Sequence, residues 1–166
     1  MSDLPGEAGD LVRRLGLAPH PEGGWYRETW RSPLQVRAPR GLRPAMTVIH
    51  YLLDAGDTSA FHRVHSEEAW FHAAGEALEL HVLEASGGYE VHRLGGQGPG
   101  GGRAHAVVPA GAWQAARPAG GSWVLASCVV APGFQFEDFE MADRAAIAAL
   151  RPDLAARLAP LCRPGT

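Results

Sequence analysis

Residues 56–75 read GDTSAFHRVHSEEAWFHAAG, and the pattern of this segment is the strongest indicator of the fold. Between the glycines at its ends lie two short runs of mixed apolar and polar residues, which is the pattern of two half-buried strands. Successive side chains on a strand face opposite sides. If Glu68 points into the interior of a barrel, Trp70 and His72 therefore point there too. His62 lies in the preceding strand.

The same succession of short apolar runs and turns continues on both sides of residues 56–75. Short runs rich in Val, Leu, Trp and Phe recur, and turns that contain glycine or proline separate them. The runs cover residues 25–31, 46–53, 59–64, 69–73, 78–83, 89–94, 105–108, 113–116 and 122–130. Many short strands at near-regular spacing predict an all-β sandwich or barrel. Residues 32–44, which are rich in proline and arginine, are predicted to form a loop.

Helical patterns are confined to the two ends of the chain. Residues 9–17 are predicted to form a short helix, and residues 143–161 are predicted to form helices of which the first is capped by Asp143. A length of 166 residues suits one domain. We therefore expect a single domain over residues 1–166, with the barrel at about 25–138.

Composition and charge exclude two classes of partner. The net charge is -3, and no run of basic residues offers attraction to nucleic acid or to an anionic membrane. No apolar stretch approaches the roughly 20 residues that span a bilayer. The polar, acidic beginning of the sequence lacks the pattern of a secretory signal. The sequence thus predicts a cytoplasmic protein whose partner is a small molecule.

The spacing of polar residues in the first stretch matches a known motif. Gly56, five residues, His62, then Glu68, six residues and Gly75 resembles the first motif of the cupin superfamily. The run PAGAWQ at residues 109–114 resembles the second motif, which ends in histidine. This resemblance implies a cupin barrel, also called a double-stranded β-helix or jelly roll, with short helices at both ends.

Two of the usual metal ligands of these motifs are replaced. Val64 stands where the first motif has its second histidine, and Gln114 stands where the second motif has its own. We therefore expect no resident cofactor or metal. If a divalent transition metal does bind, its ligands would be His62, Glu68 and Gln114.

A second resemblance extends from about residue 15 to residue 150. The runs PHPEGGWYRET at 19–29, EEAW at 67–70, VPAGAW at 108–113 and APGFQFEDF at 131–139 resemble blocks of a cupin subfamily catalogued as predicted sugar epimerases (DUF985). The resemblance implies a comparison with deoxysugar epimerases of the same fold, which use no metal. In those enzymes a histidine polarised by a carboxylate removes a proton next to a ketone, and a tyrosine returns a proton on the opposite face.

The resemblance also implies catalytic roles for particular residues. His62 is the candidate base, because it aligns with the motif histidine and its ordinary pKa suits neutral solution. Glu68 would orient His62 or raise its pKa. Tyr26 or Tyr51 would act as the acid, and the sequence does not decide between them.

Other residues are candidates for binding the substrate. Arg27 or Arg63 would contact a phosphate or an enolate oxygen. Glu22 would either close the pocket or tie down its own turn. Trp70 and Trp113 are expected to form an apolar wall. The full set of candidate substrate-binding residues is Glu22, Arg27, Arg63, Trp70, His72, Trp113 and Gln114.

Three functions remain open at this point. The first is a metal-independent isomerase or epimerase that acts on a sugar or a nucleotide sugar. The second is a metal-dependent isomerase or dioxygenase, and the third is a non-catalytic module that binds a small molecule. In each case we expect a homodimer, because two-fold pairs are the commonest assemblies and the outward strand faces are rich in apolar residues.

Overall fold

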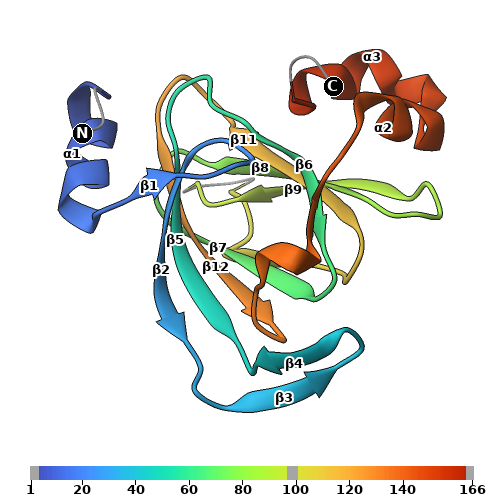
Figure 1. Cartoon of the computed structure of the whole chain (residues 1–166). Coiled ribbons are helices and arrows are strands. Elements are labelled where there is room, and N and C mark those ends of the chain that lie inside the picture. The colour runs from blue at the N-terminus through green and yellow to red at the C-terminus, as the bar shows by residue number, and fades with distance from the viewer. Residues whose placement is uncertain (1–3, 97–100, 164–166) are drawn as a thin grey trace.

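The computed structural model describes residues 4–96 and 101–163 and shows two antiparallel sheets that face each other as a barrel (Figure 1). The predicted all-β jelly-roll architecture is thus confirmed. Residues 1–3, 97–100 and 164–166, which belong to the predicted domain, lie outside the described residues.

The larger sheet has six strands in the order β1-β2-β5-β12-β7-β10. Its members are β1 (Ala18–Pro19), β2 (Trp25–Arg31), β5 (Thr47–Leu53), β7 (Glu67–Gly75), β10 (His105–Val108) and β12 (Val124–Ala131). The register of β2 on β5 shifts between Glu28 and Trp30. Such a bulge shifts the alternation by one residue, so that Arg31 and Glu28 face the same side.

The smaller sheet has five strands in the order β13-β6-β11-β8-β9. Its members are β6 (Ser59–Val64), β8 (Leu78–Leu83), β9 (Tyr89–Leu94), β11 (Trp113–Pro118) and β13 (Phe139–Met141). Gln114 of β11 lies directly opposite His62 of β6. The two motif positions, far apart in the sequence, are therefore neighbours in the sheet.

The prediction of a loop at 32–44 is wrong. Within it β3 (Gln35–Ala38) and β4 (Gly41–Pro44) pair as an antiparallel hairpin. Gly41 has a φ of 120°, which a glycine adopts without steric cost after the tight turn between the strands. The segment is rich in proline and arginine, and proline is uncommon in strands. Its two strands are also too short to show a clear alternation.

A buried ion pair anchors this hairpin to the rest of the molecule. Nε and Nη2 of Arg43 donate to the two carboxylate oxygens of Asp138 at 2.6 and 2.9 Å. Asp138 belongs to the short 3-10 helix η1 (Phe136–Asp138). The hairpin is thus held against the segment that precedes β13, and Figure 1 shows the hairpin beyond one end of the barrel.

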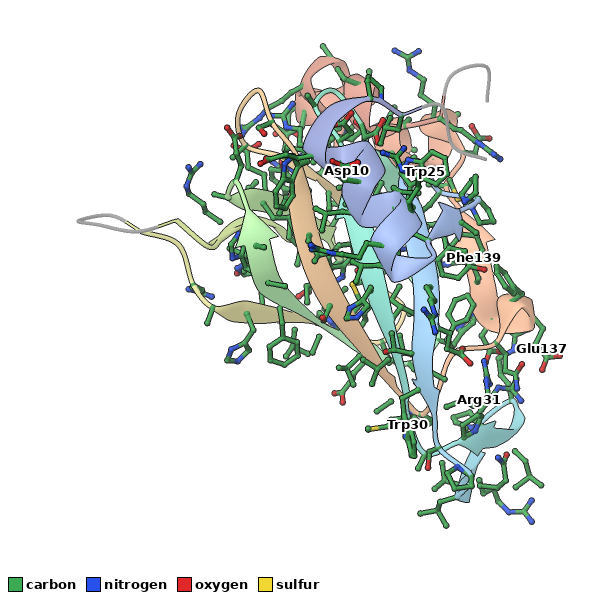
Figure 2. All side chains as sticks on the ribbon, turned by 90° about the vertical axis from the view of Figure 1, so that its left-hand side faces the viewer. Asp10, Trp25, Trp30, Arg31, Glu137 and Phe139 are labelled. Atoms are coloured by element: carbon green, nitrogen blue, oxygen red, sulfur yellow. The ribbon has the colours of Figure 1, made fainter. Side chains whose placement is uncertain are left out.

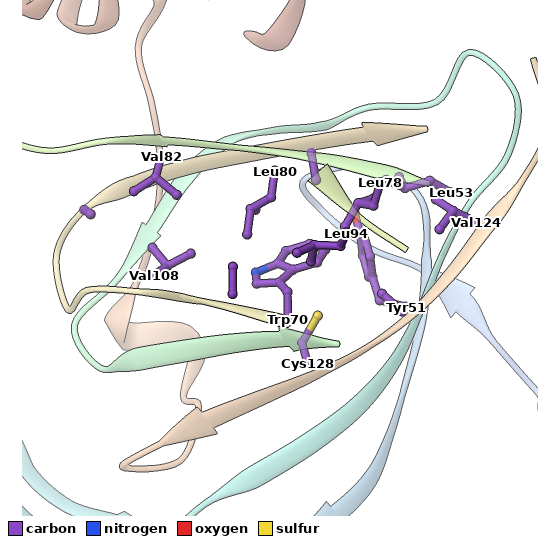
Figure 3. Packing of buried hydrophobic residues seen from close by; sticks show 14 residues of the cluster. Tyr51, Leu53, Trp70, Leu78, Leu80, Val82, Leu94, Val108, Val124 and Cys128 are labelled. Carbon is purple, nitrogen blue, oxygen red and sulfur yellow. The ribbon is translucent and has the colours of Figure 1, made fainter. Parts of the chain in front are cut away.

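The barrel interior is divided between an apolar core and a cavity. In the core, the Trp70 indole lies at the centre of the cluster, with Leu80, Leu94, Cys128 and Tyr51 around it (Figure 3). The rings of Trp70 and Tyr51 meet edge to face with centroids 5.5 Å apart. Full burial of a large apolar side chain contributes about 1.5–3 kcal/mol to the stability of the fold. Because the side chains of this cluster come from both sheets, they hold the sheets at a fixed distance.

The terminal helices cover the outside of the barrel. At the start, α1 (Gly6–Leu15) begins three residues before the predicted position and ends at Gly16 in the left-handed conformation. At the end come α2 (Arg144–Leu150), η2 (Pro152–Leu154), α3 (Ala155–Leu158) and η3 (Ala159–Leu161).

The predicted cap of the first C-terminal helix is confirmed. The Asp143 side chain accepts a hydrogen bond from the backbone N–H of Ala145. The C-terminal helices bury Ile147, Leu158 and Leu161 against the outer face of the smaller sheet. None of the helices formed by residues 4–96 and 101–163 has the length and apolar content that crossing a bilayer requires.

Candidate functional site

A cavity of about 270 Å³ opens between the two sheets. His62 and Glu68, the two residues on which the sequence prediction depends, both line it. The complete lining is His20, Glu22, Tyr26, Glu28, Arg31, Thr47, Ile49, Tyr51, His62, Val64, Glu68, Trp70, Cys128, Val130, Phe134, Gln135, Phe136 and Phe139. Aromatic rings therefore form much of the wall, and the buried acid–base groups lie among them.

The orientation of His62 is fixed by a backbone group and by a carboxyl group. Its Nδ1 lies 2.8 Å from the carbonyl oxygen of Ala60. Because a carbonyl only accepts, Nδ1 carries the hydrogen. Nε2 lies 3.1 Å from Oε2 of Glu22. The carboxyl group that contacts His62 is thus Glu22, whereas the sequence had assigned this role to Glu68.

Glu22 is held in a tight turn between β1 and β2. Its Oε1 accepts a 2.8 Å hydrogen bond from the Ser59 hydroxyl, and its Oε2 lies 3.3 Å from Nδ1 of His20. A Cβ at Gly23 would lie 2.2 Å from the carbonyl oxygen of Thr58, so only glycine fits there. Glu22 therefore both lines the cavity and is tied to its turn, the two alternatives that the sequence left open.

A short contact joins two buried titratable groups, His62 and Glu22. Burial lowers the pKa of His62, although the nearby Glu68 opposes this, and burial raises the pKa of Glu22. Burial also lowers the pKa of His20. All three shifts favour uncharged groups. The 3.1 Å contact between Nε2 and Oε2 is short enough for the two groups to share a proton.

Glu68 is held by a chain of two side chains. The indole N–H of Trp70 donates to Oε1 of Gln114 at 2.8 Å, and Nε2 of Gln114 donates to Oε2 of Glu68 at 2.6 Å. Since an indole can only donate, Trp70 fixes which end of the Gln114 amide faces Glu68. Burial raises the pKa of Glu68 to about 7, despite the opposing effects of His62 and Gln114.

The two candidate tyrosines occupy different positions. Tyr51 is buried and its hydroxyl donates to the carbonyl oxygen of Gly23, which braces the turn that carries Glu22. Burial raises the pKa of Tyr51 well above its ordinary value. Tyr26 lines the cavity, and its ring meets the His20 ring edge to face at 4.5 Å between centroids.

Five of the predicted site residues do not line the cavity. Arg27 donates to the carbonyl oxygen of Leu15, and Arg63 lies over the Trp113 ring and pairs with Glu140. They are adjacent in sequence to Tyr26 and His62, which face inward, so strand alternation turns both arginines outward. Trp113 directly precedes the inward-facing Gln114 on β11, so strand alternation turns it outward too. There it packs under the C-terminal helices.

His72 and Gln114 lie behind the cavity wall. His72 faces inward as predicted, but its Nε2 lies 2.8 Å from the carbonyl oxygen of Glu76, and its ring fills the space beside Gly95. The apolar core separates it from the cavity. Gln114 is fully buried and contacts the cavity through Glu68.

Sequence reasoning missed several lining residues. These are chiefly His20, Glu28, Arg31, Phe134, Phe136 and Phe139. The rings of His62 and Phe139 have centroids 5.5 Å apart. Figure 2 shows Arg31 and Phe139 along the same edge of the barrel. The run APGFQFEDF had indicated that this segment matters, and the bulge in β2 explains why Arg31 was not expected inside.

The predicted alternative metal ligands do not fit a cation. The amide oxygen of Gln114 accepts from Trp70, and its amide nitrogen faces Glu68. Val64 supplies no donor atom. Within residues 4–96 and 101–163, no group of three or more His, Cys, Asp or Glu side chains is arranged to hold a metal ion. Gln114 and Glu68 are therefore hydrogen-bonded to each other, while His62 is held by Ala60 and Glu22.

The fold and the cavity together define a small-molecule-binding cupin. The chain belongs to the family described as "Cupin superfamily (DUF985)", which matches residues 9–142. It is similar to a hypothetical protein from Leishmania major, with 32% identity over 95% of this chain and 99% of that chain and a TM-score of 0.85. It is also similar to a protein from Shewanella oneidensis, with 32% identity over 96% and 99% of the two chains and a TM-score of 0.87.

More distant structures share only the fold. Oxalate decarboxylase from Bacillus subtilis is 14% identical, with a TM-score of 0.54 over 86% of this chain and 36% of that chain. A cupin 2 conserved barrel domain protein from Rhodopseudomonas palustris is 17% identical, with a TM-score of 0.59 over 89% and 91% of the two chains. Comparison with curated proteins yields no match.

Proposed function

We propose that the protein is a metal-independent isomerase or epimerase that moves a proton next to the carbonyl group of a sugar. The observation that supports this most strongly is that two separate acid–base units, Glu68 and the His62–Glu22 pair, line one aromatic cavity. Proton removal next to a carbonyl needs a base at the carbon and a donor at the oxygen. The resemblance to predicted sugar epimerases supports the same class of reaction.

The geometry favours a division of roles that differs from the sequence prediction. Glu68 is the better candidate for the base, because a pKa of about 7 lets it take up and release a proton in neutral solution. The His62–Glu22 pair retains a proton and is the candidate donor to the carbonyl oxygen. A donor fixed in a buried site stabilises the developing enolate more than water does.

The C–H bond next to the carbonyl breaks, its proton moves to the Glu68 carboxylate, and its electron pair becomes the enolate. The His62–Glu22 pair donates its proton to the enolate oxygen. In an isomerisation Glu68 then gives its proton to the former carbonyl carbon, and the neighbouring hydroxyl of the enediol loses its proton to the His62–Glu22 pair as the new carbonyl forms. In an epimerisation the enol O–H returns its proton to the pair, and the carbon receives a proton on the face opposite to Glu68. Tyr26, which lines the cavity, is the candidate to return a proton on the opposite face in an epimerisation, because Tyr51 is engaged with Gly23.

The second candidate function is a binding module without catalysis. It is favoured by the contacts of Glu22, whose carboxyl oxygens already have Ser59, His20 and His62 as partners. A purely structural cluster of this kind would orient a ligand without exchanging protons with it. The metal-dependent alternative has no support in the donor set.

Deuterium exchange distinguishes these functions. Aldoses, ketoses and keto sugars are incubated with the protein in deuterated water, and the loss of the C–H signal next to the carbonyl is followed by NMR. We expect exchange with the wild type and with His65→Asn, a change at an exposed residue between β6 and β7, and loss of at least about 100-fold in Glu68→Gln and His62→Asn. Binding without exchange above the His62→Asn background would reject the enzyme and favour the binding module.

A further inference from the structure

The charges around the cavity restrict the ligand that it can hold. Its buried part contains the carboxyl groups of Glu22 and Glu68 and the imidazoles of His20 and His62. Among the described residues that line the cavity, Arg31 is the only one with a permanent positive charge. Where these carboxyl groups are ionised they repel an anionic ligand group, and where they are protonated they offer it no positive charge.

Arg31 is not available to compensate an anion. Its Nε and Nη2 donate to the two carboxylate oxygens of Glu28 at 2.9 and 2.8 Å, and Nη2 also lies 3.2 Å from the carbonyl oxygen of Phe134. This is the two-pronged geometry in which a guanidinium otherwise binds a phosphate. Glu28 therefore occupies the position that a phosphate would need.

Several other arginines of this region are paired with acidic side chains or turned away from the cavity, and Arg37, exposed on β3, does not line it. Arg43 pairs with Asp138 and Glu137, and Arg40 lies 3.5 Å from Asp138. Arg27 and Arg63, the phosphate ligands expected from the sequence, point to the outside of the barrel. No cationic subsite for a nucleotide or a phosphate is thus formed by the residues whose contacts are described.

The size and walls of the cavity indicate what does fit. The volume of about 270 Å³ lies just below the ~300–1,000 Å³ of pockets that hold drug-sized ligands, so a ligand of about one sugar ring fits it. A nucleotide sugar has in addition a base, a ribose and phosphates. The rings of Tyr26, Trp70 and Phe139 offer apolar faces to a ring, and the carboxyl groups accept hydrogen bonds from its hydroxyls.

We infer that the cavity selects an uncharged, single-ring polyhydroxy compound, a free sugar, and rejects sugar phosphates and nucleotide sugars. This inference rests on the proposed function in that it names the substrate class of the same cavity. It also explains the Glu28–Arg31 pair, which the reaction itself does not use: the pair neutralises the one cation that would otherwise attract an anion.

Calorimetric binding tests the inference without requiring turnover. Free monosaccharides are titrated against their monophosphates and their nucleotide-linked forms, with inorganic pyrophosphate as the minimal anionic probe. We expect a free sugar to bind at least about tenfold more tightly than its phosphorylated counterparts. Tighter binding of any phosphorylated form, or no binding by any free sugar of the panel, would overturn the inference.

A gain-of-function variant makes the test specific. Glu28→Gln releases Arg31, so the affinity for pyrophosphate and for sugar phosphates should rise at least about tenfold, and the double variant Glu28→Gln/Arg31→Gln should lose that gain. No gain in Glu28→Gln would show that the pair is not the element that excludes anions. Binding of a free sugar without deuterium exchange would contradict the proposed reaction and leave the ligand class supported, so the two failures are distinguishable.

Discussion

The amide nitrogen of Gln114 donates a 2.6 Å hydrogen bond to Oε2 of Glu68. The residue that replaces a motif histidine thus holds the carboxyl group of the other motif. With Trp70 behind it, this contact fixes Glu68 in a buried position where its pKa is raised by desolvation. Gln114, in place of the motif histidine, thus ties Glu68 into a hydrogen-bonded chain that suits the proposed proton transfer.

Glu22→Gln should abolish proton donation and keep the fold. The amide oxygen can still accept from Ser59, but the amide cannot share an acidic proton with Nε2 of His62. We expect the deuterium exchange rate to fall by about 100-fold to 10,000-fold, with little change in the circular dichroism spectrum. Ser59→Ala, which removes the bracing hydroxyl and leaves the carboxyl group, should cost less. Equal rates in Glu22→Gln and the wild type would reject a role for the pair.

The stability difference between the wild type and Glu68→Gln should depend on pH. Below about pH 4.5, Glu68 is protonated in both the folded and the unfolded states. As the pH rises towards 7, the unfolded state releases this proton and the folded state retains it, so unfolding becomes easier. The free energy of unfolding of the wild type should therefore decline relative to the variant by a few kcal/mol, at ~1.4 kcal/mol per pKa unit, and then level off above pH 7. Urea unfolding of both proteins between pH 4.5 and 8 measures this difference in the free energy of unfolding. A difference that does not change with pH would contradict the raised pKa of Glu68.

Restoring the motif histidines should create a metal site. Val64→His together with Gln114→His would place two further imidazoles beside His62 and Glu68, which is a ligand set that divalent transition metals prefer. We expect the double variant, purified without chelator, to retain close to one equivalent of metal by elemental analysis. Val64→His alone and the wild type should retain far less. Stoichiometric metal in the wild type would contradict the interpretation of Gln114 as an anchor for Glu68.

The predicted homodimer should form through the outer face of the larger sheet. Phe71 and Val107 are 39% and 51% exposed on neighbouring strands of this face, and the Phe71 ring stacks on His105. Light scattering should give the mass of a dimer for the wild type and of a monomer for Phe71→Glu. Val91→Glu, a matched change on β9 of the other sheet, should remain dimeric. A monomeric wild type, or a dimeric Phe71→Glu, would reject this interface.

The sequence predicted the strands and the two motif residues well for a physical reason. Alternation and glycine-containing turns are local signals, and the predicted runs at 25–31, 59–64, 78–83, 89–94 and 105–108 agree with the strands in their bounds. The motif spacing then placed His62 and Glu68 in one hollow.

The remaining errors arose where contacts are not local. Glu22 meets His62 only because β2 packs beside β5 and the turn before it folds over Ser59, which no spacing reveals. Arg27 and Arg63 were proposed as ligands although their neighbours Tyr26 and His62 face inward. Strand alternation, applied strictly, would have excluded both arginines. The bulge that brings Arg31 inside leaves no comparable signal in the sequence.

The proposed reaction depends on Glu68 being a buried carboxyl group that titrates near neutral pH inside the ligand cavity. Carbon-13 NMR titration of the glutamate carboxyl groups, with Glu68→Gln used to assign the signal, measures this pKa directly. We expect the carboxyl signal of Glu68 to titrate with a midpoint at about pH 7 in the free protein. A midpoint near the ~4.3 of a solvated glutamate would contradict it.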